Sequence, residues 1–184
     1  GEESKTSLSK ADSLSYADVV EDARNYFKTG VTKKLEWRKQ QLRQIHKMIS
    51  ENHDRITEAI LKDHGGPKLR GVFDMGCVND AAFTIKNLNK WAADQKVPHD
   101  SMLGRSYVRK EPKGVVLVIA PWNFPFAMVF DALVNIIGAG NCVVVKPSEV
   151  SVNTCELIAE LIPKYFDNRA VKVVTGGIPE TTAL

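Results

Sequence analysis

Cysteine is scarce in this sequence, and its few copies form no pattern. Three cysteines among 184 residues leave an odd thiol and show no metal-ligand spacing, and the four histidines are scattered. The chain also lacks an Asn-x-Ser/Thr sequon and an apolar signal-peptide region. These absences argue against a disulfide scaffold, a metal site and a secreted glycoprotein. We therefore expect an intracellular, cytoplasmic protein with reduced thiols and no metal.

A strong excess of one charge is absent as well. The net charge is +3, with 43% apolar and 26% charged residues, which is the ordinary range of a globular domain. Basic residues are densest between positions 33 and 47, in a predicted helix whose other face is apolar. A solvated helix face explains this cluster better than a nucleic-acid patch. We expect one sizeable domain without a nucleic-acid partner.

Charge is almost missing from one long stretch. Residues 114–145 carry a single charge, Asp131, and a hydropathy scan would assign them to a membrane span. However, Pro121 and Pro125 would interrupt such a helix at its centre, with the polar Asn123 between them. Asp131 would then lie in hydrocarbon, which is costly. The stretch is better interpreted as strand, turn, helix and strand, and we expect no membrane span in it.

Three short apolar runs alternate with two stretches at helical spacing. The runs are residues 115–120, 142–145 and 171–174. They have the form of parallel strands that are covered on both faces. The first helical stretch, 126–137, meets a stop at Gly138-Ala139-Gly140, and Ser151 is placed to cap the second, whose last turn Pro163 disturbs. This alternation predicts an α/β fold with a doubly wound, Rossmann-like parallel sheet that binds ligands at the carboxyl ends of its strands.

The sequence before the predicted sheet has helical periodicity. Two helical stretches meet near Asn52-His53, Gly65-Gly66-Pro67 makes a hard break, and a third helix covers residues 78–91. A polar segment with alternating side chains then predicts an extended arm or hairpin. The expected organisation is a disordered segment (1–12), a helical part (13–96), an arm (97–112) and the first βαβ units of the sheet (113–184).

Asn123 and Lys146 each follow a predicted strand, so both are expected at the carboxyl edge of the sheet. A carboxamide at that edge can donate hydrogen bonds to an oxygen that becomes negative during a reaction. Lys146 precedes Pro147, which favours an extended backbone that points the ammonium out of the strand end. That places it either as a surface lysine or as a group that binds ribose or phosphate. Trp122 alone would be a core aromatic and Asn123 alone a turn residue, but together they indicate half of an active site.

Two segments carry a resemblance to a known family. Residues 114–125 (GVVLVIAPWNFP) and 140–149 (GNCVVVKPSE) resemble the aldehyde dehydrogenase superfamily. Within it, residues 162–167 (IPKYFD) and 174–177 (VTGG) resemble most the class 3 branch, which uses NAD or NADP. The resemblance runs from about residue 19 to residue 184 and covers the N-terminal portion only.

The resemblance implies roles for residues at the strand ends. Asn123 would be the catalytic residue here, as the oxyanion-hole amide that stabilises a tetrahedral thiohemiacetal. The other implied residues would bind NAD or NADP: Ile119, Ala120 and Trp122 at the nicotinamide, Lys146 and Glu149 at the adenosine ribose, and Gly176 and Gly177 near the adenine. Lys146 could also meet a 2′-phosphate. Such enzymes oxidise small aldehydes to carboxylic acids at a cysteine, and the arm would form a homodimer in a full-length protein.

The sequence departs from the family in what it omits. It contains no Gly-Gln-x-Cys nucleophile segment, no Glu-Leu-Gly-Gly base segment and no Phe-x-Gly-Ser/Thr turn for the pyrophosphate. Leu69-Arg70-Gly71 stands where relatives usually place a glutamate, so we expect an altered contact between helices. The 184-residue chain alone is expected to be inactive. It is then either the N-terminal part of a full enzyme or a non-catalytic relative that binds nucleotide weakly or pairs with a longer homologue.

Overall fold

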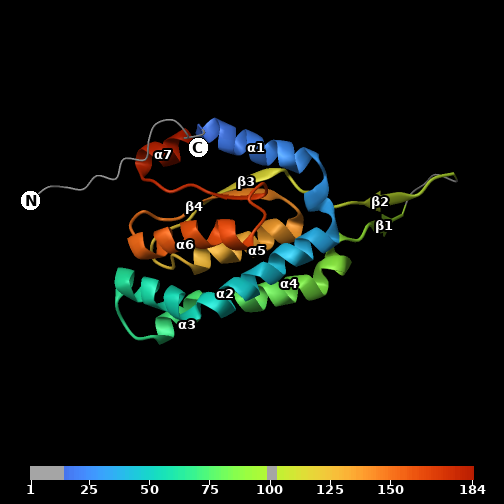
Figure 1. Cartoon of the computed structure of the whole chain (residues 1–184). Helices are drawn as coiled ribbons and strands as arrows, with labels where there is room; N and C mark the ends of the chain where they lie inside the picture. Colours follow the sequence, from blue (N-terminus) through green and yellow to red (C-terminus); the bar gives the residue numbers. More distant parts are fainter. Residues whose placement is uncertain (1–14, 99–102) are drawn as a thin grey trace, which may run out of the picture.

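The chain folds around a parallel sheet, and a separate two-stranded hairpin projects away from the domain (Figure 1). The computed structural model describes residues 15–98 and 103–184. The expected disorder at 1–12, and part of the expected arm, lie outside the described residues. No helix of the described ranges combines the length and the apolar content needed to cross a bilayer.

The sheet has three parallel strands among the described residues. These are β3 (Val115–Ile119), β4 (Cys142–Lys146) and β5 (Val171–Val173), in the order β3-β4-β5. Val115 pairs with Cys142 and Ile119 with Lys146, so β3 and β4 end at the same edge. The three apolar runs therefore form the predicted strands, and the α/β fold class is confirmed.

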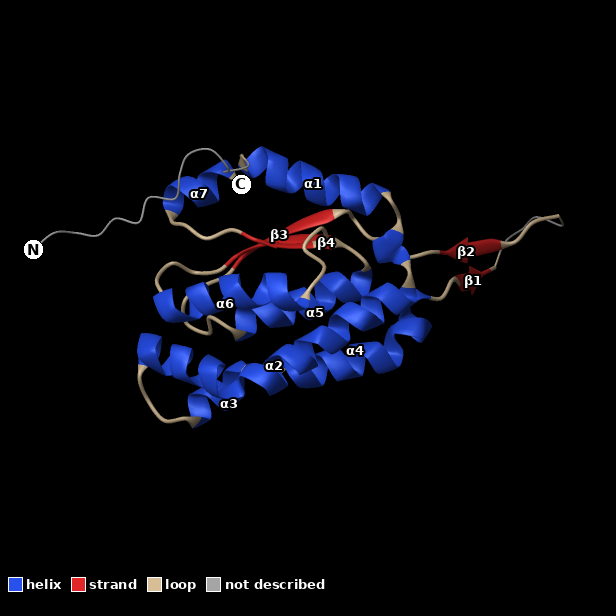
Figure 2. Cartoon of the chain, viewed as in Figure 1, coloured by secondary structure: helices blue, strands red, loops and turns tan. Residues whose placement is uncertain are grey.

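Helices cover both faces of the sheet (Figure 2). Helix α1 (Tyr16–Lys28) lies on one face. On the other face lie α5 (Ala127–Ala139) and α6 (Val152–Tyr165), because two successive crossovers in one direction place their helices on the same side. Helices α2 (Leu35–His64) and α4 (Cys77–Ala92) pack outside α5 and α6 as a further layer.

The main hydrophobic core lies between the sheet and α5 and α6. Phe126 and Phe130 are fully buried there, with ring centroids 4.3 Å apart. Every residue of β4 is buried, as expected for a strand covered on both faces. The expectation is wrong for β3, in which Leu117 is 41% and Ile119 54% exposed. The reason is position, since β3 lies at one side of the described sheet and β4 at its centre.

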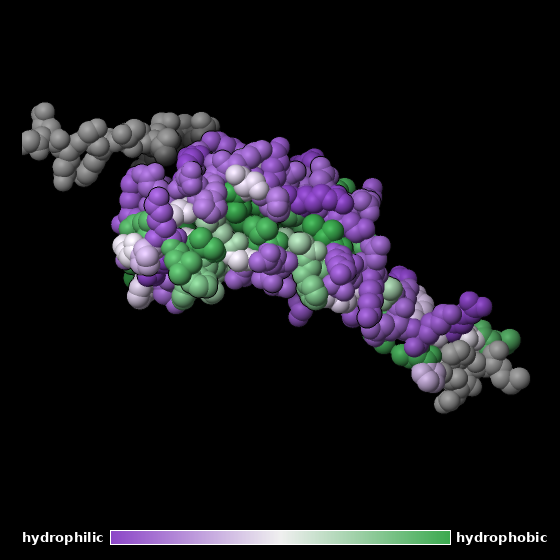
Figure 3. All heavy atoms as spheres, turned by 90° about the horizontal axis from the view of Figure 1, so that it is seen from below, coloured by the Kyte–Doolittle hydropathy of each residue, from purple (hydrophilic) through white to green (hydrophobic). Residues whose placement is uncertain are grey.

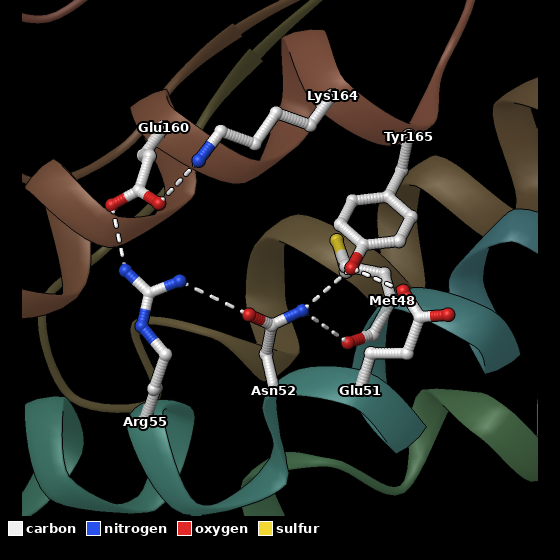
Figure 4. Close-up of polar contacts among 7 residues, drawn as sticks. All are labelled: Met48, Glu51, Asn52, Arg55, Glu160, Lys164 and Tyr165. Atoms are coloured by element: carbon white, nitrogen blue, oxygen red, sulfur yellow. Dashed lines mark hydrogen bonds and ion pairs between the residues drawn. The ribbon is translucent and has the colours of Figure 1, made fainter.

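Helix α2 bends at Asn52, where the sequence predicts the meeting of two helical stretches. Asn52 has non-helical angles (φ −127°, ψ 17°), and its amide donates to Met48 O (2.9 Å) and to Tyr165 Oη of α6 (2.8 Å). Arg55 donates to Asn52 Oδ1 (3.1 Å) and to Glu160 Oε2 (2.7 Å), which ties the bend to α6 (Figure 4). The bend directs the end of α2 towards the start of α6.

The remaining elements are short. They are a 3₁₀ turn (Val31–Lys33), α3 (Leu69–Asp74), β1 (Gln95–Val97), β2 (Ser106–Val108) and α7 (Ile178–Ala183). Strands β1 and β2 pair antiparallel as a hairpin that begins at Gln95, two residues before the predicted start of the arm at Val97. Helix α3 follows the predicted break at Gly65 and was not anticipated as an element.

The outer layer of helices exposes apolar side chains. Seen from the side of α2, α3 and α4, apolar areas lie among polar ones (Figure 3). Large exposed apolar residues on α3 and α4 are Leu69, Val72, Phe73, Phe83 and Trp91. Phe73 is the most exposed of these, at 70%.

Candidate functional site

The segments that carry Asn123 and Lys146 leave the sheet at the same edge. Ala120 directly follows β3, and its N–H donates to Lys146 O (3.0 Å) at the end of β4. The structure thus brings together the two strand ends that the sequence singles out. Of the flanking residues, Ile119 is half exposed and Ala120 is buried.

In the connection from β3 to α5, residues 120–126, two main-chain carbonyls accept hydrogen bonds from other elements, and residues 121–124 are exposed. Trp122 O accepts from Ser151 Oγ (3.0 Å), and Asn123 O accepts from Arg70 Nη2 (3.2 Å). The Trp122 side chain is 54% exposed and stacks against His64, so it is not a core aromatic. Asn123 is exposed, and among the described residues its carboxamide has no hydrogen-bond partner. Its two N–H donors are therefore available to a ligand.

Lys146 is buried, contrary to its interpretation as a surface lysine. Its side chain is 3% exposed, and Nζ donates to Glu149 Oε2 (2.5 Å) and to Gly176 O (2.9 Å). The hydrogen bond from Lys146 lowers the pKa of the half-exposed Glu149 carboxyl. An ammonium has three N–H donors, so one remains beyond these two bonds. Three of the predicted cofactor-binding residues thus form one hydrogen-bonded cluster.

Gly176 and Gly177 lie under the side chain of Glu180. Gly176 has φ +143°, and a Cβ built on it would lie 2.4 Å from Glu180 Cγ. Glu180 Oε2 accepts from Gly177 N (2.7 Å) at the start of α7. The space beside Gly176, which the resemblance places near an adenine, is therefore occupied by Glu180 in this conformation.

The two helices that follow the strands are capped by carboxylates from the outer layer. Asp63 of α2 accepts from Asn153 N (2.9 Å) and Thr154 N (2.8 Å) of α6. Asp74 of α3 accepts from Ala127 N of α5 (3.1 Å). Each helix start thus already holds a negative charge, which opposes the binding of a phosphate there.

Ser151 does not cap α6 as the sequence predicts. It occupies the N-cap position, but its hydroxyl donates to Trp122 O and lies 3.2 Å from His64 Nε2. Asp63 supplies the cap in its place. The residue therefore joins the start of α6 to the turn that bears Asn123.

The two capping carboxylates have opposite pKa shifts. Partial burial pushes the pKa of Asp63 up, but hydrogen bonds from Asn153 and Thr154 outweigh it and leave the pKa below the ordinary value. Asp74 is 1% exposed, and burial raises its pKa despite backbone hydrogen bonds from Ala127 and Phe126. Its second oxygen, Oδ2, has no partner among the described residues.

The three cysteines are free and buried. Burial raises the pKa of Cys77 to about 12 and that of Cys142 to about 11, and it also raises the pKa of Cys155. A thiol with so high a pKa forms little of the nucleophilic thiolate at neutral pH. None of the three has the setting of a nucleophile.

Sequence reasoning missed the side chains that support the site. His64, Asp63, Arg70 and Asp74 all come from the outer helices and meet the strand ends only in the folded chain. One signal was present for Asp74, because it is the single carboxylate within the otherwise apolar run 71–75. The sequence singles out Leu69-Arg70-Gly71, where Arg70 contacts the turn in the structure. The altered contact between helices that we expect there stays a prediction.

Comparisons with known proteins point to the same family as the strand-end segments do. The aldehyde dehydrogenase family model matches residues 2–184. An aldehyde dehydrogenase of Rattus norvegicus, described as dimeric and NADP-preferring, is 40% identical over 174 residues, 92% of this chain and 38% of the relative. Aldehyde dehydrogenase family 3 member I1 of Arabidopsis thaliana, a chloroplastic protein, is 39% identical over 90% of this chain and 31% of the relative.

Solved structures give the same assignment. The substrate-bound state of AldH from Staphylococcus aureus superposes with a TM-score of 0.87 and 35% identity, over 92% of this chain and 38% of that protein. This chain therefore spans about two fifths of the length of such relatives and corresponds to their N-terminal portion. The family model and the relatives, in agreement with the strand-end turn and the lysine cluster, show that this chain belongs to the aldehyde dehydrogenase family.

Proposed function

We propose that this chain is the cofactor-binding N-terminal part of an NAD(P)-dependent aldehyde dehydrogenase that oxidises aldehydes to carboxylic acids. The observation that carries the proposal is the cluster of Lys146, Glu149 and Gly176 beside the strand-end turn, whose exposed Asn123 carboxamide is unpaired among the described residues. The Rattus norvegicus relative, described as NADP-preferring, supports either NAD or NADP as cofactor. Bound at this edge, the cofactor supplies a hydride acceptor.

The chemistry of the strand-end groups fits such a cofactor. Glu149 is a charged carboxylate that can accept hydrogen bonds from ribose hydroxyls, and the remaining donor of Lys146 can meet a hydroxyl or a 2′-phosphate. Ile119, Ala120 and Trp122 would form an apolar wall for the nicotinamide. Gly176 and Gly177 would approach the adenine after Glu180 turns away. No pyrophosphate contact is assigned to the starts of α5 and α6, because both are capped by carboxylates.

Asn123 is the proposed catalytic residue of this part of the enzyme. Its carboxamide would donate a hydrogen bond to the oxygen that becomes negative when a cysteine adds to the aldehyde carbonyl. That cysteine and the general base would come from segments beyond these 184 residues, so the chain alone is proposed to be inactive. The buried, high-pKa thiols of the chain support this part of the proposal.

The hairpin of β1 and β2 is the proposed dimer contact of the complete enzyme. All six residues of its strands are exposed, including Val97, Tyr107 and Val108. Exposed apolar residues on a projecting hairpin are suited to pairing with a second copy. The relative from Rattus norvegicus is described as dimeric. A cytoplasmic location is part of the proposal, since three free thiols suit a reducing compartment.

A nucleotide titration of the 184-residue chain tests the cofactor role. We expect NADPH and NADH to bind weakly, with Lys146→Met weakening NADPH about tenfold or more through loss of a charge-assisted hydrogen bond. Methionine keeps the apolar stem of the buried side chain, and Lys164→Met, which removes a surface lysine paired with Glu160, is the matched control. Isothermal titration calorimetry provides the dissociation constants. Absence of binding to the parent chain, or equal constants for the parent and Lys146→Met, would overturn the proposal.

A further inference from the structure

The turn that carries Asn123 is held by side chains from other elements. Ser151, at the start of α6, donates to the carbonyl oxygen of Trp122 (3.0 Å). Arg70, on α3, donates to the carbonyl oxygen of Asn123 (3.2 Å). These two carbonyls belong to the peptide groups on either side of the Asn123 Cα atom.

Fixing both peptide groups fixes the direction of the side chain between them. A peptide group is planar, so the main chain at one residue has only two soft dihedral angles, φ and ψ. When both neighbouring planes are hydrogen-bonded to rigid elements, both angles are set and the Cα–Cβ bond of Asn123 has one direction. The carboxamide then extends from one fixed Cα–Cβ bond in a small set of staggered rotamers, and it makes no hydrogen bond of its own within the described residues.

Helix α3 also anchors the end of the same turn. Asp74 lies four residues after Arg70, so both side chains lie on one face of the helix. Asp74 Oδ1 accepts from Ala127 N (3.1 Å), while Asp74 Oδ2 and Arg70 Nε are buried without partners among the described residues. Leaving such groups unpaired costs about 1–3 kcal/mol each. The N-cap residue of α5 is Phe126, whose side chain cannot accept a hydrogen bond. Asp74 therefore provides the cap that the turn itself lacks.

A close approach between two helices brings α3 to the turn. Gly71 is buried against Thr57 of α2, and a Cβ built on it would lie 2.8 Å from Thr57 Oγ1. Only a residue without a side chain permits this spacing. The segment Arg70-Gly71 therefore combines the contact to Asn123 with the packing that makes the contact reachable.

We propose that Arg70 is a positioning residue that, together with Ser151 and Asp74, orients the carboxamide of Asn123. The assignment rests on the proposed function, in which that carboxamide stabilises an oxyanion. Among the described residues, Arg70 hydrogen-bonds only to main chain at this site, so its effect on the reaction would pass through Asn123.

Nitrogen-15 relaxation of the 184-residue chain tests the proposal. In the parent, the amides of Trp122, Asn123 and Phe124 should show order parameters of about 0.85, and in Arg70→Ala these should fall to below about 0.6. Arg70→Lys should recover most of the loss, because one ammonium can still donate to the carbonyl. The matched control is Arg55→Ala, which removes another arginine that joins two elements, and it should leave the three amides unchanged.

Rigid amides in Arg70→Ala, within error of the parent, would overturn the proposal, as would equal loosening in Arg55→Ala. Ser151→Ala provides a second variant that removes the other carbonyl contact, and unchanged amides there would also contradict it. The side-chain NH₂ signal of Asn123 should broaden or divide in the loosened variants. The relaxation measurement needs no cofactor. A failure to bind NADPH would therefore count against the proposed function but would not change the relaxation result.

Discussion

The connections that follow β3 and β4 leave the same edge of the sheet, yet they differ in what they expose. Residues 121–124 are all exposed, including Trp122 and Phe124, and form the open connection, whereas the second, the closed connection, buries Pro147, Ser148 and Ser151 and exposes Glu149 and Val150. Each connection leads into a helix whose start is capped by an aspartate from the outer layer. An aspartate cap from the outer layer therefore supports both the open connection and the closed connection.

The difference extends to the two capping carboxylates. Asp63 uses both oxygens and has a lowered pKa, so its interactions favour the charged form. Asp74 uses one oxygen and has a raised pKa, so its site disfavours the charged form. The comparison teaches that the open turn carries a local cost in stability, which is typical of residues arranged for function.

The largest expected effect is at the closed connection. Asp63→Ala removes the cap of α6 and three hydrogen bonds, from Asn153 N, Asn153 Nδ2 and Thr154 N. We expect the free energy of unfolding to fall by about 2 kcal/mol at pH 7. Because the folded pKa of Asp63 is lowered, its contribution is present above the unfolded pKa and is lost as pH falls through the folded pKa. Urea unfolding at pH 7 and pH 3 measures this, and an unchanged midpoint at pH 7 would contradict it.

A smaller effect of opposite sign is expected at the open connection. Asn at position 74 keeps the acceptor for Ala127 N and removes the buried charge, so Asp74→Asn should raise the free energy of unfolding by about 1 kcal/mol at pH 7. The raised pKa of Asp74 means that the parent gains stability below the unfolded pKa and loses it as pH rises through the folded pKa. The advantage of the variant should therefore vanish near pH 3. If Asp74→Asn is less stable than the parent at pH 7, the two connections do not differ as described.

The smallest expected effect is in the exposure of thiols by local opening. Cys77 lies just after α3, and Cys155 lies in the first turn of α6. Both are buried, so alkylation by iodoacetamide at pH 8 requires local unfolding. We expect Cys77 to react severalfold faster than Cys155, because short α3 supports the open turn. Peptide mapping by mass spectrometry gives both rates, and the reverse order would argue against a looser region around α3.

Local sequence patterns predicted most of the helices and strands, because the signals for each element lie within its own residues or directly beside them. The apolar run 142–145 forms a buried strand, Gly140 ends α5 in the left-handed conformation, and Asn52 marks the bend in α2. The supporting contacts of the site could not be predicted this way. Lys146 is buried, and its ammonium donates a hydrogen bond to the carbonyl oxygen of Gly176, thirty residues later. The pairing of Arg70 with Asn123 likewise depends on how separate elements pack, which no local pattern encodes.

The position of α1 has a consequence for the order of folding during synthesis. Tyr26 of α1 donates to Asp167 Oδ2 (2.7 Å), a residue 141 positions later, and α1 packs across β4. At about 5–20 residues per second, a ribosome needs on the order of ten seconds to make the chain between them. Helix α1 therefore completes its contacts only after β5 and Asp167 have been made, and until then part of its inner face is open to chaperones or to unwanted partners.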